Sequence, residues 1–193
     1  MGLNLGNTGD FKGHIRYMAS TSSWSMSVKD SKEQKNFVFT QAVIDLEKIK
    51  TGWGLFPEGQ APKWVMDASL TQPATKPADE AGQSYKRGFK VDVFSKSLFG
   101  DEPVREFATS ATGAVMGIQA LYEQFEKELP NNKGSVPVVE FKGAIPTKVG
   151  KGNTTVPTLV IVKWIPRPAE LDAVETKQSA PAPTAPAVSA SEF

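Results

Sequence analysis

The chain has 193 residues, 22 basic and 21 acidic side chains, a single histidine and no cysteine. The lack of cysteine excludes disulfides, thiolate nucleophiles, zinc fingers and iron–sulfur clusters, and a single histidine excludes a multi-histidine metal site. No apolar run approaches the roughly 18–20 residues of a membrane span, and no signal-peptide pattern opens the sequence. We therefore expect a soluble, cytoplasmic protein with no membrane partner.

The charge divides unevenly along the chain. From Ala169 onward four acidic residues accompany one lysine, whereas the preceding residues carry 21 basic and 17 acidic side chains. A mildly basic body with an acidic tail is compatible with a partner that carries phosphates. We expect a flexible N-terminus over residues 1–10, one folded domain over residues 11–168, and a disordered Ala/Pro-rich acidic tail over residues 169–193.

The first half of the chain predicts strands and turns. One or two strands are expected between residues 11 and 28. The alternation of apolar residues over Asn36–Ile49 predicts one long strand that Gly52 ends, with a helix as the alternative for its second half. A short strand over Lys63–Ala68 is followed by a polar, proline-rich loop over Thr71–Gln83, which we expect to be mobile.

The second half predicts a strand, a helix and two more strands. In Ser84–Phe94 (SYKRGFKVDVF) apolar residues alternate with polar ones, which indicates a strand. Pro103 is expected to begin the helical part, and a stripe of apolar residues predicts the clearest helix over Ala111–Glu128. Strands over Pro137–Phe141 and Thr158–Ile165 are expected to flank a hairpin-like loop.

This order of elements predicts a fold that is mainly β with one substantial helix. Strands followed by a helix and then strands are typical of the OB arrangement, so we expect an OB-like antiparallel β-barrel. A generic α+β sandwich is the fallback.

Cationic and aromatic side chains gather at the start of the strand over Ser84–Phe94. On a pleated surface, cations neutralise phosphates and aromatic rings stack on bases of any identity. An ordinary solvated strand face has the same composition, and Phe37, Phe39 and Trp64 fit a core as well as a stacking surface. The candidate nucleic-acid-binding residues are Tyr85, Lys86, Arg87, Lys90, Phe37, Phe39, Trp53, Lys142, Lys148 and Lys151.

One pattern suggests catalysis instead. Val138–Lys142 (VVEFK) has the apolar-strand-then-E-x-K form of the metal-dependent PD-(D/E)xK nucleases, in which carboxylates hold Mg²⁺ and the lysine supports the attacking water. A helix and a polar turn occupy the interval in which those nucleases place a further aspartate. We therefore expect a non-enzyme without cofactor or metal, and keep two alternatives: a Mg²⁺-dependent nuclease, and a structural or assembly protein that binds no nucleic acid.

The order of elements, the cationic aromatic strand and the closing Ser191-Glu192-Phe193 together resemble the single-stranded DNA-binding proteins of bacteriophages. The resemblance implies an OB-fold body that grips single-stranded DNA without sequence preference, in replication or recombination. It also implies that the tail, through Glu192 and Phe193, recruits replication proteins in the cytoplasm of the host cell. Whether the protein forms a homo-oligomer is left open.

Overall fold

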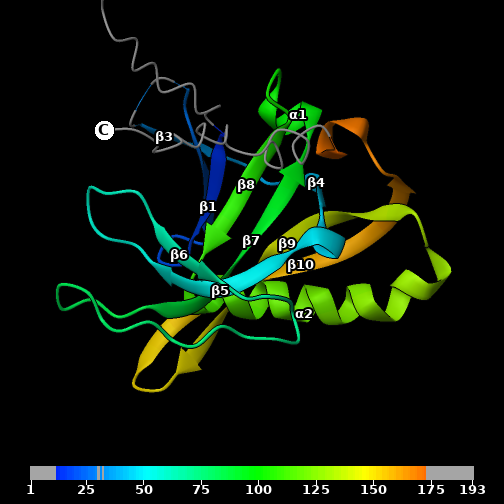
Figure 1. Ribbon diagram of the computed structural model, residues 1–193. Coiled ribbons are helices and arrows are strands. Elements are labelled where there is room, and N and C mark those ends of the chain that lie inside the picture. Colours follow the sequence, from blue (N-terminus) through cyan, green and yellow to red (C-terminus); the bar gives the residue numbers. More distant parts are fainter. Residues whose placement is uncertain (1–11, 30, 32, 173–193) are drawn as a thin grey trace, which may run out of the picture.

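A computed structural model describes residues 12–29, 31 and 33–172 (Figure 1). The predicted N-terminal segment over residues 1–10 and most of the predicted tail, including Glu192 and Phe193, lie outside the described residues. Within the described part, no helix has the length and apolar content to cross a membrane.

Strands dominate the described residues. They are β1 (His14–Met18), β2 (Ser23–Ser27), β3 (Gln34–Phe37), β4 (Gln41–Ile44), β5 (Lys50–Leu55), β6 (Lys63–Met66), β7 (Lys86–Phe94), β8 (Val104–Thr109), β9 (Ser135–Val149) and β10 (Gly152–Pro166). The helices are α1 (Lys96–Phe99) and α2 (Thr112–Glu128), with 3-10 turns η1 (Leu46–Lys48) and η2 (Leu129–Asn131). The fold is thus mainly β with one substantial helix, as predicted.

The described strands form one ten-stranded sheet in the order β10-β9-β4-β7-β8-β1-β2-β3, with β5 and β6 branching from β7. Strands β1 and β8 pair in parallel, while the other pairs of described strands are antiparallel. The sheet is therefore open and mixed, and a closed antiparallel barrel is not shown.

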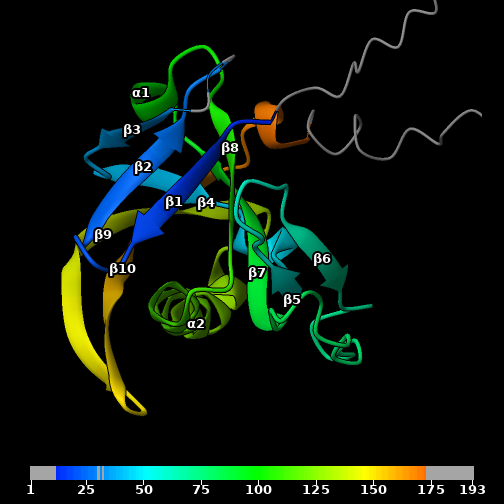
Figure 2. The same cartoon turned by 90° about the vertical axis from the view of Figure 1, so that its left-hand side faces the viewer.

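The sheet nevertheless curls, so that β1 and β2 lie beside β9 and β10 (Figure 2). Trp24 on β2 lies 5.8 Å from Phe141 on β9, measured between ring centroids. The hydroxyls of Tyr17 on β1 and Thr155 on β10 are 2.9 Å apart. Trp24 and Phe107 are almost fully buried in the core that the curl encloses, and burial of such aromatic rings is a major stabilising contribution.

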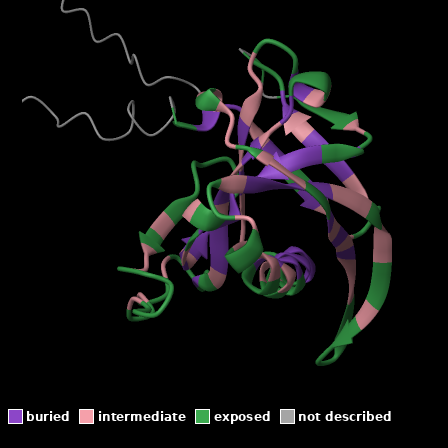
Figure 3. Ribbon diagram, turned by 90° about the vertical axis from the view of Figure 1, so that its right-hand side faces the viewer, coloured by how far each residue is buried: buried purple, intermediate pink, exposed green. Residues whose placement is uncertain are grey.

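Helix α2 packs against β10, where two glycines of the helix let the backbones approach closely. A Cβ atom on Gly113 would lie 2.2 Å from the Thr155 carbonyl oxygen, and one on Gly117 would lie 2.7 Å from Pro157. Any larger residue would therefore push the helix off the strand. Figure 3 shows the sheet-facing side of α2 buried and its other side exposed. This agrees with the apolar stripe predicted from the sequence.

The predicted single strand over Asn36–Ile49 is wrong, because this segment crosses between two parts of the sheet. β3 pairs with β2, whereas β4 pairs with β7 and β9. Within the crossing Phe39 turns into the core, 4.8 Å from the Trp24 ring, and Val38 is 79% exposed. The alternation in the sequence continues through the crossing, so periodicity alone does not reveal it.

The helical start predicted at Pro103 is also wrong. The residues after Pro103 form β8, which pairs with β7 on one side and β1 on the other. Arg105 occupies a core-facing position of this strand, and this cation hides the β periodicity of the sequence. Arg105 is buried, and its Nη1 donates a 2.8 Å hydrogen bond to the Ser27 carbonyl oxygen.

The loop predicted between Phe141 and Thr158 is instead the outer half of a long hairpin. β9 and β10 pair almost continuously from Ser135–Pro166 to Val149–Gly152. The outer half extends past α2 and is largely exposed (Figures 2 and 3). The two outer strands lack a buried side, and this explains why no apolar alternation marked them.

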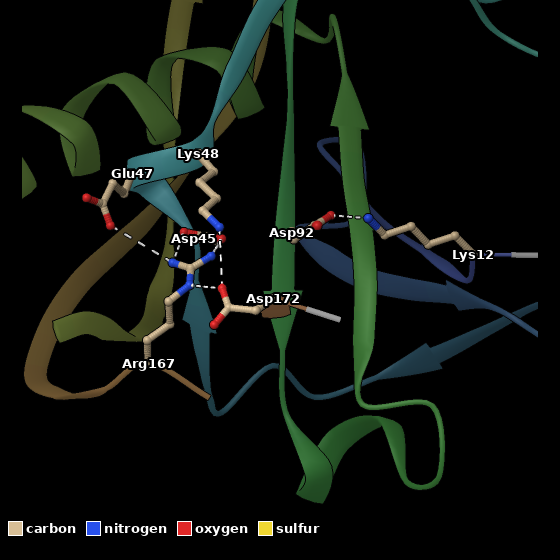
Figure 4. A network of polar contacts seen from close by, with 7 residues as sticks. All are labelled: Lys12, Asp45, Glu47, Lys48, Asp92, Arg167 and Asp172. Carbon is tan, nitrogen blue, oxygen red and sulfur yellow. Dashed lines mark hydrogen bonds and ion pairs between the residues drawn. The ribbon is translucent and has the colours of Figure 1, made fainter. Parts of the chain in front are cut away.

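The described body continues beyond Pro168 to Asp172. Leu171 is buried, and Arg167 donates two hydrogen bonds to the buried carboxylate of Asp45, at 2.9 and 2.5 Å (Figure 4). Arg167 Nε also donates to Asp172 at 2.7 Å, and Lys48 lies 3.4 Å from the same carboxylate oxygen. The paired carboxylates raise the pKa of Arg167 above its usual range. These contacts fasten the segment after β10 to η1.

Candidate nucleic-acid interface

The start of β7 separates two surfaces, because consecutive strand residues point to opposite faces and cross-strand partners share a face. Lys86 pairs with Gly54, which in turn pairs with Trp64 of β6. The next residue, Arg87, pairs with Trp53. We call the side of Lys86 and Trp64 the groove face, and the side of Arg87 and Trp53 the network face.

The network face is closed by a buried carboxylate. Asp67 accepts two hydrogen bonds from Arg87, at 2.8 and 2.5 Å, and further ones from Thr51 Oγ1 and from the Ala74 amide at 2.9 Å. The Arg87 guanidinium also lies 5.2 Å from the Trp53 ring centroid, and Trp53 Nε1 donates to the Ala74 carbonyl at 2.8 Å. These donors, Arg87 first, hold the pKa of Asp67 far below its usual range.

Tyr85 belongs to the same closed side. It is 5% exposed, and its hydroxyl donates to Glu80, which also forms an ion pair with Lys63. The hydrogen bond from Lys63, followed by that from Tyr85, lowers the pKa of Glu80. These contacts thus tie the loop over Thr71–Gln83 to β6 and β7. Tyr85, Arg87 and Trp53 are engaged within the protein.

The groove face, in contrast, opens into a groove of about 820 Å³. Strands β1 and β8 form one wall, the loop between β5 and β6 forms the other, and β7 lies between them; Figure 2 faces these elements. Its charged residues are Lys12, Arg16, Lys86, Lys90, Glu58 and Glu106, and its aromatic residues are Tyr17, Phe56 and Trp64. The groove therefore combines an excess of cations with rings.

Two of the four groove cations are not neutralised by the described residues. Among the described residues, Arg16 and Lys86 form no ion pair, and both are exposed. Lys90 lies 3.8 Å from Glu106, and Lys12 pairs with Asp92 at 2.5 Å (Figure 4). The groove thus retains positive charge that a phosphate group can neutralise.

A second, smaller cavity of about 210 Å³ continues the groove and shares Lys12, Lys90 and Glu106 with it. It adds Lys48 and Lys50, and we call it the lysine pocket. Lys50 on β5 is the direct cross-strand partner of Lys90 on β7. Like charges opposite each other destabilise an antiparallel pair, whereas an anion between them would favour it.

Two aromatic rings form the far wall of the groove. Trp64 and Phe56 lie 5.5 Å apart between centroids, at 83°, and Lys90 Nζ lies 5.3 Å from the Trp64 centroid. A Cβ atom at position 54 would come within 3.0 Å of Trp64 and 3.1 Å of Phe56, so Gly54 allows both rings to lie against the strand. This aromatic pair offers a base a stacking partner beside a cation.

His14 lines the groove, and its pKa reflects the burial and the charges around it. Its pKa is lowered by burial first and then by the positive charges of Arg16 and Arg105, while Glu106 raises it. Its Nε2 lies 3.2 Å from the side-chain nitrogen of Gln34. Burial disfavours any charge at this position, but the positive charges of Arg16 and Arg105 would attract an anion.

The other predicted residues lie elsewhere. Phe39 is buried against Trp24, and Phe37 packs on Phe39 and on Phe99, with centroid distances of 6.3 and 5.9 Å. Neither ring lines the groove. Lys142, Lys148 and Lys151 are exposed on the outer half of the β9–β10 hairpin, away from Lys86 and Lys90.

The two charged residues of the E-x-K pattern, Glu140 and Lys142, form an ion pair with each other. Lys142 Nζ lies 2.5 Å from Glu140 Oε1, and Gln41 Nε2 donates to the other carboxylate oxygen at 3.3 Å. The hydrogen bond from Lys142 is the main reason that the pKa of Glu140 is lowered. In the described part of the chain, no group of three or more His, Asp or Glu side chains is placed to hold a metal ion.

Sequence reasoning missed Lys12, Arg16, Lys50 and Phe56, which come from segments far from Ser84–Phe94. One signal was available for Arg16: it alternates with Ile15 and Tyr17, which are buried, and so must face outward. For the other three, only the strand pairing brings them to the groove.

No family model, no curated protein and no solved structure matches this chain.

Proposed function

We propose that this protein binds single-stranded DNA without sequence preference, in the groove and the lysine pocket. The observation that carries the proposal is the aromatic pair of Trp64 and Phe56 in a groove whose cations include Arg16 and Lys86, which form no ion pair with the described residues. Rings alone fit many ligands and cations alone fit many anions. A nucleic-acid strand presents flat bases and phosphates in alternation, and therefore matches both.

The residues divide the binding between them. Arg16, Lys86 and Lys90 contact phosphates, and the rings stack on bases, at roughly 1–3 kcal/mol for each stacked base. Neither interaction depends on the identity of the base, which accounts for sequence tolerance. In a duplex the bases are already stacked on each other, so the aromatic pair would add little, and we expect a preference for single strands.

The topology supports an OB-like body for this proposal. The chain follows the OB order of strands, helix and strands: β4 and β5 together, then β7 and β8, then α2, then β9 and β10. In addition, β4 pairs with β9. In OB folds, oligonucleotides bind across the second and third strands and the loops beside them. Here these are β7 and β8, the loop with Phe56 and the β9–β10 hairpin, so we include Lys148 and Lys151 as outer contacts.

The cellular role rests on the sequence resemblance. We propose that binding serves phage-type DNA replication or recombination, and that Glu192 and Phe193 contact replication proteins. Deleting the last two residues should abolish such recruitment and leave oligonucleotide affinity unchanged.

Fluorescence anisotropy tests the binding itself. Labelled oligo-dT, an RNA of the same length and a DNA duplex are titrated with the protein at two salt concentrations, with and without Mg²⁺. We expect the tightest binding to oligo-dT, no shortening of the probe, and a steep loss of affinity with salt because counterions are released. Absence of binding at low salt would overturn the proposal, and Mg²⁺-dependent shortening would favour a nuclease.

A double variant links the binding to the groove. Arg16→Gln with Lys86→Gln removes two expected phosphate contacts, which should reduce the slope of log K against log salt by about 1.4. Lys35→Gln is the matched control, because Lys35 is exposed on β3 and forms no ion pair with the described residues.

A further inference from the structure

The lysine pocket has a charge arrangement that an ordinary solvated strand face avoids. We propose that it is a dedicated phosphate site, which holds a phosphate group independently of the aromatic pair. That this phosphate belongs to a nucleic-acid strand rests on the proposed function; the pocket itself does not depend on it.

The first argument is the register of β5 on β7. Lys50 lies directly opposite Lys90, and both side chains line the pocket. Such a pair destabilises the sheet in the empty protein. The repulsion becomes an attraction when an anion lies between the two ammonium groups, so a bound anion would favour the arrangement.

The second argument is that the local carboxylates are already engaged. Of the two acidic residues that line the pocket, Asp92 pairs with Lys12 and Glu106 lies near Lys90. Lys50 has no carboxylate partner among the described residues and is exposed. Lys50, the cation that faces Lys90, therefore has a positive charge that no carboxylate of the described residues neutralises.

The third argument is position. The pocket, at about 210 Å³, is a quarter of the size of the adjoining groove and contains no aromatic ring among its described lining residues. Lys90 lines both cavities and lies over the Trp64 ring. A base stacked on Trp64 therefore places its neighbouring phosphate at the pocket.

The stability of the empty protein gives the first test. Lys50→Gln removes the repulsion, so at low salt it should raise the melting temperature by about 1–3 °C. The gain should vanish near 1 M salt, where the Debye length falls to about 3 Å. Lys35→Gln should leave the melting temperature unchanged under both conditions. A melting temperature that stays the same or falls in Lys50→Gln would overturn the proposed repulsion.

Binding gives the second test, with probes that lack bases. Sodium tripolyphosphate and an abasic deoxyribose-phosphate oligomer are titrated into the full chain by calorimetry. We expect Lys50→Gln to weaken both about fivefold to tenfold, whereas Trp64→Ala and Lys35→Gln should have little effect. Equal affinity of the Lys50→Gln variant and the parent for both probes would overturn the phosphate site.

The two proposals fail in different ways. If oligo-dT binds and depends on Trp64 but not on Lys50, the phosphate site is wrong and the proposed function stands. If tripolyphosphate binds through Lys50 while neither oligomer binds, the pocket is a site for free phosphate compounds and the nucleic-acid function is wrong.

Discussion

The groove face and the network face of the paired strands β5 and β7 are built from the same kinds of residue. They differ in what those residues contact. On the network face, Arg87 and Trp53 are held by Asp67 and by the loop that carries Ala74. On the groove face, Lys86 and Trp64 line an open cavity. Composition does not distinguish these faces; the presence of a buried carboxylate does.

The comparison separates stability from binding. A cation paired with a buried carboxylate contributes to the folded state, and the pair has little remaining attraction for a ligand. An unpaired surface cation contributes nothing to the fold and keeps its full attraction for phosphate. Substitutions on the network face should therefore change stability alone, and substitutions of groove-face cations such as Lys86 should change affinity with little effect on stability. Lys50, whose charge lies opposite that of Lys90, is the exception.

The largest expected effect lies on the network face. Asp67→Ala leaves Arg87 and the Ala74 amide without their acceptor, and should lower the free energy of unfolding by about 2–4 kcal/mol. Chemical denaturation measures the loss, and oligo-dT affinity at low temperature should not change. Asp79→Ala, an exposed carboxylate of the same loop, is the control and should change stability by less than about 0.5 kcal/mol.

The same carboxylate predicts a pH dependence. Because the folded-state pKa of Asp67 is lowered, its contribution to stability is complete above the unfolded value of about 3.9 and is lost as the pH falls toward the folded value. The stability difference between the parent and Asp67→Ala should therefore shrink below about pH 4. A difference that is constant down to pH 2 would contradict this assignment.

The two tryptophans provide the next contrast. Trp64→Ala should weaken oligo-dT binding by about 1–3 kcal/mol, the value of one stacked base, whereas Trp53→Ala should destabilise the protein and leave affinity unchanged. Anisotropy and denaturation of both variants measure the two quantities. Loss of affinity in Trp53→Ala with none in Trp64→Ala would reverse the assignment of the faces.

Two neighbouring residues of one strand sharpen the contrast further. Lys86→Gln should weaken oligo-dT binding by about 1 kcal/mol without loss of stability, since it removes a charged contact to phosphate. Arg87→Gln should do the opposite, because its partner is Asp67. A loss of affinity of similar size in both variants would show that the strand edge binds as a whole.

The smallest effect is a titration shift on the groove face. Phosphate near His14 should raise its pKa, which burial and two arginines lower in the free protein. Binding then takes up protons between the free and bound pKa values, so affinity should rise as the pH falls through that window. NMR resolves the shift directly, because the chain has one histidine. An unchanged His14 pKa with saturating oligo-dT would place the strand elsewhere.

Local patterns in the sequence predicted much of the fold. The one or two strands expected between residues 11 and 28 are β1 and β2, the alternation over Ser84–Phe94 identified β7, and the apolar stripe identified α2. The failures came where side chains take exceptional positions, as with Arg105 facing the core and Phe39 in a crossing segment. Of the predicted site residues on β7, Lys86 and Lys90 line the groove. Arg87 and Tyr85 do not, because they bind Asp67 and Glu80, and these partners depend on a segment that has no periodic signal.

The groove itself could not be predicted from one stretch, because strand register creates it. Lys50 meets Lys90 only through the pairing of β5 with β7. Arg16 reaches the same cavity only because β1 lies beside β8. Neither pairing leaves a mark in the local sequence.

The parallel pairing of β1 with β8 has a consequence for how the protein is made. His14 pairs with Glu106, and almost half of the chain's 193 residues separate them. Closing so long a loop is slow, and contacts of this separation form late in folding. During synthesis, the wall of the groove that β1 and β8 form together therefore cannot be completed until β8 has left the ribosome. If the protein binds DNA as proposed, the nascent chain should acquire that affinity only at that point.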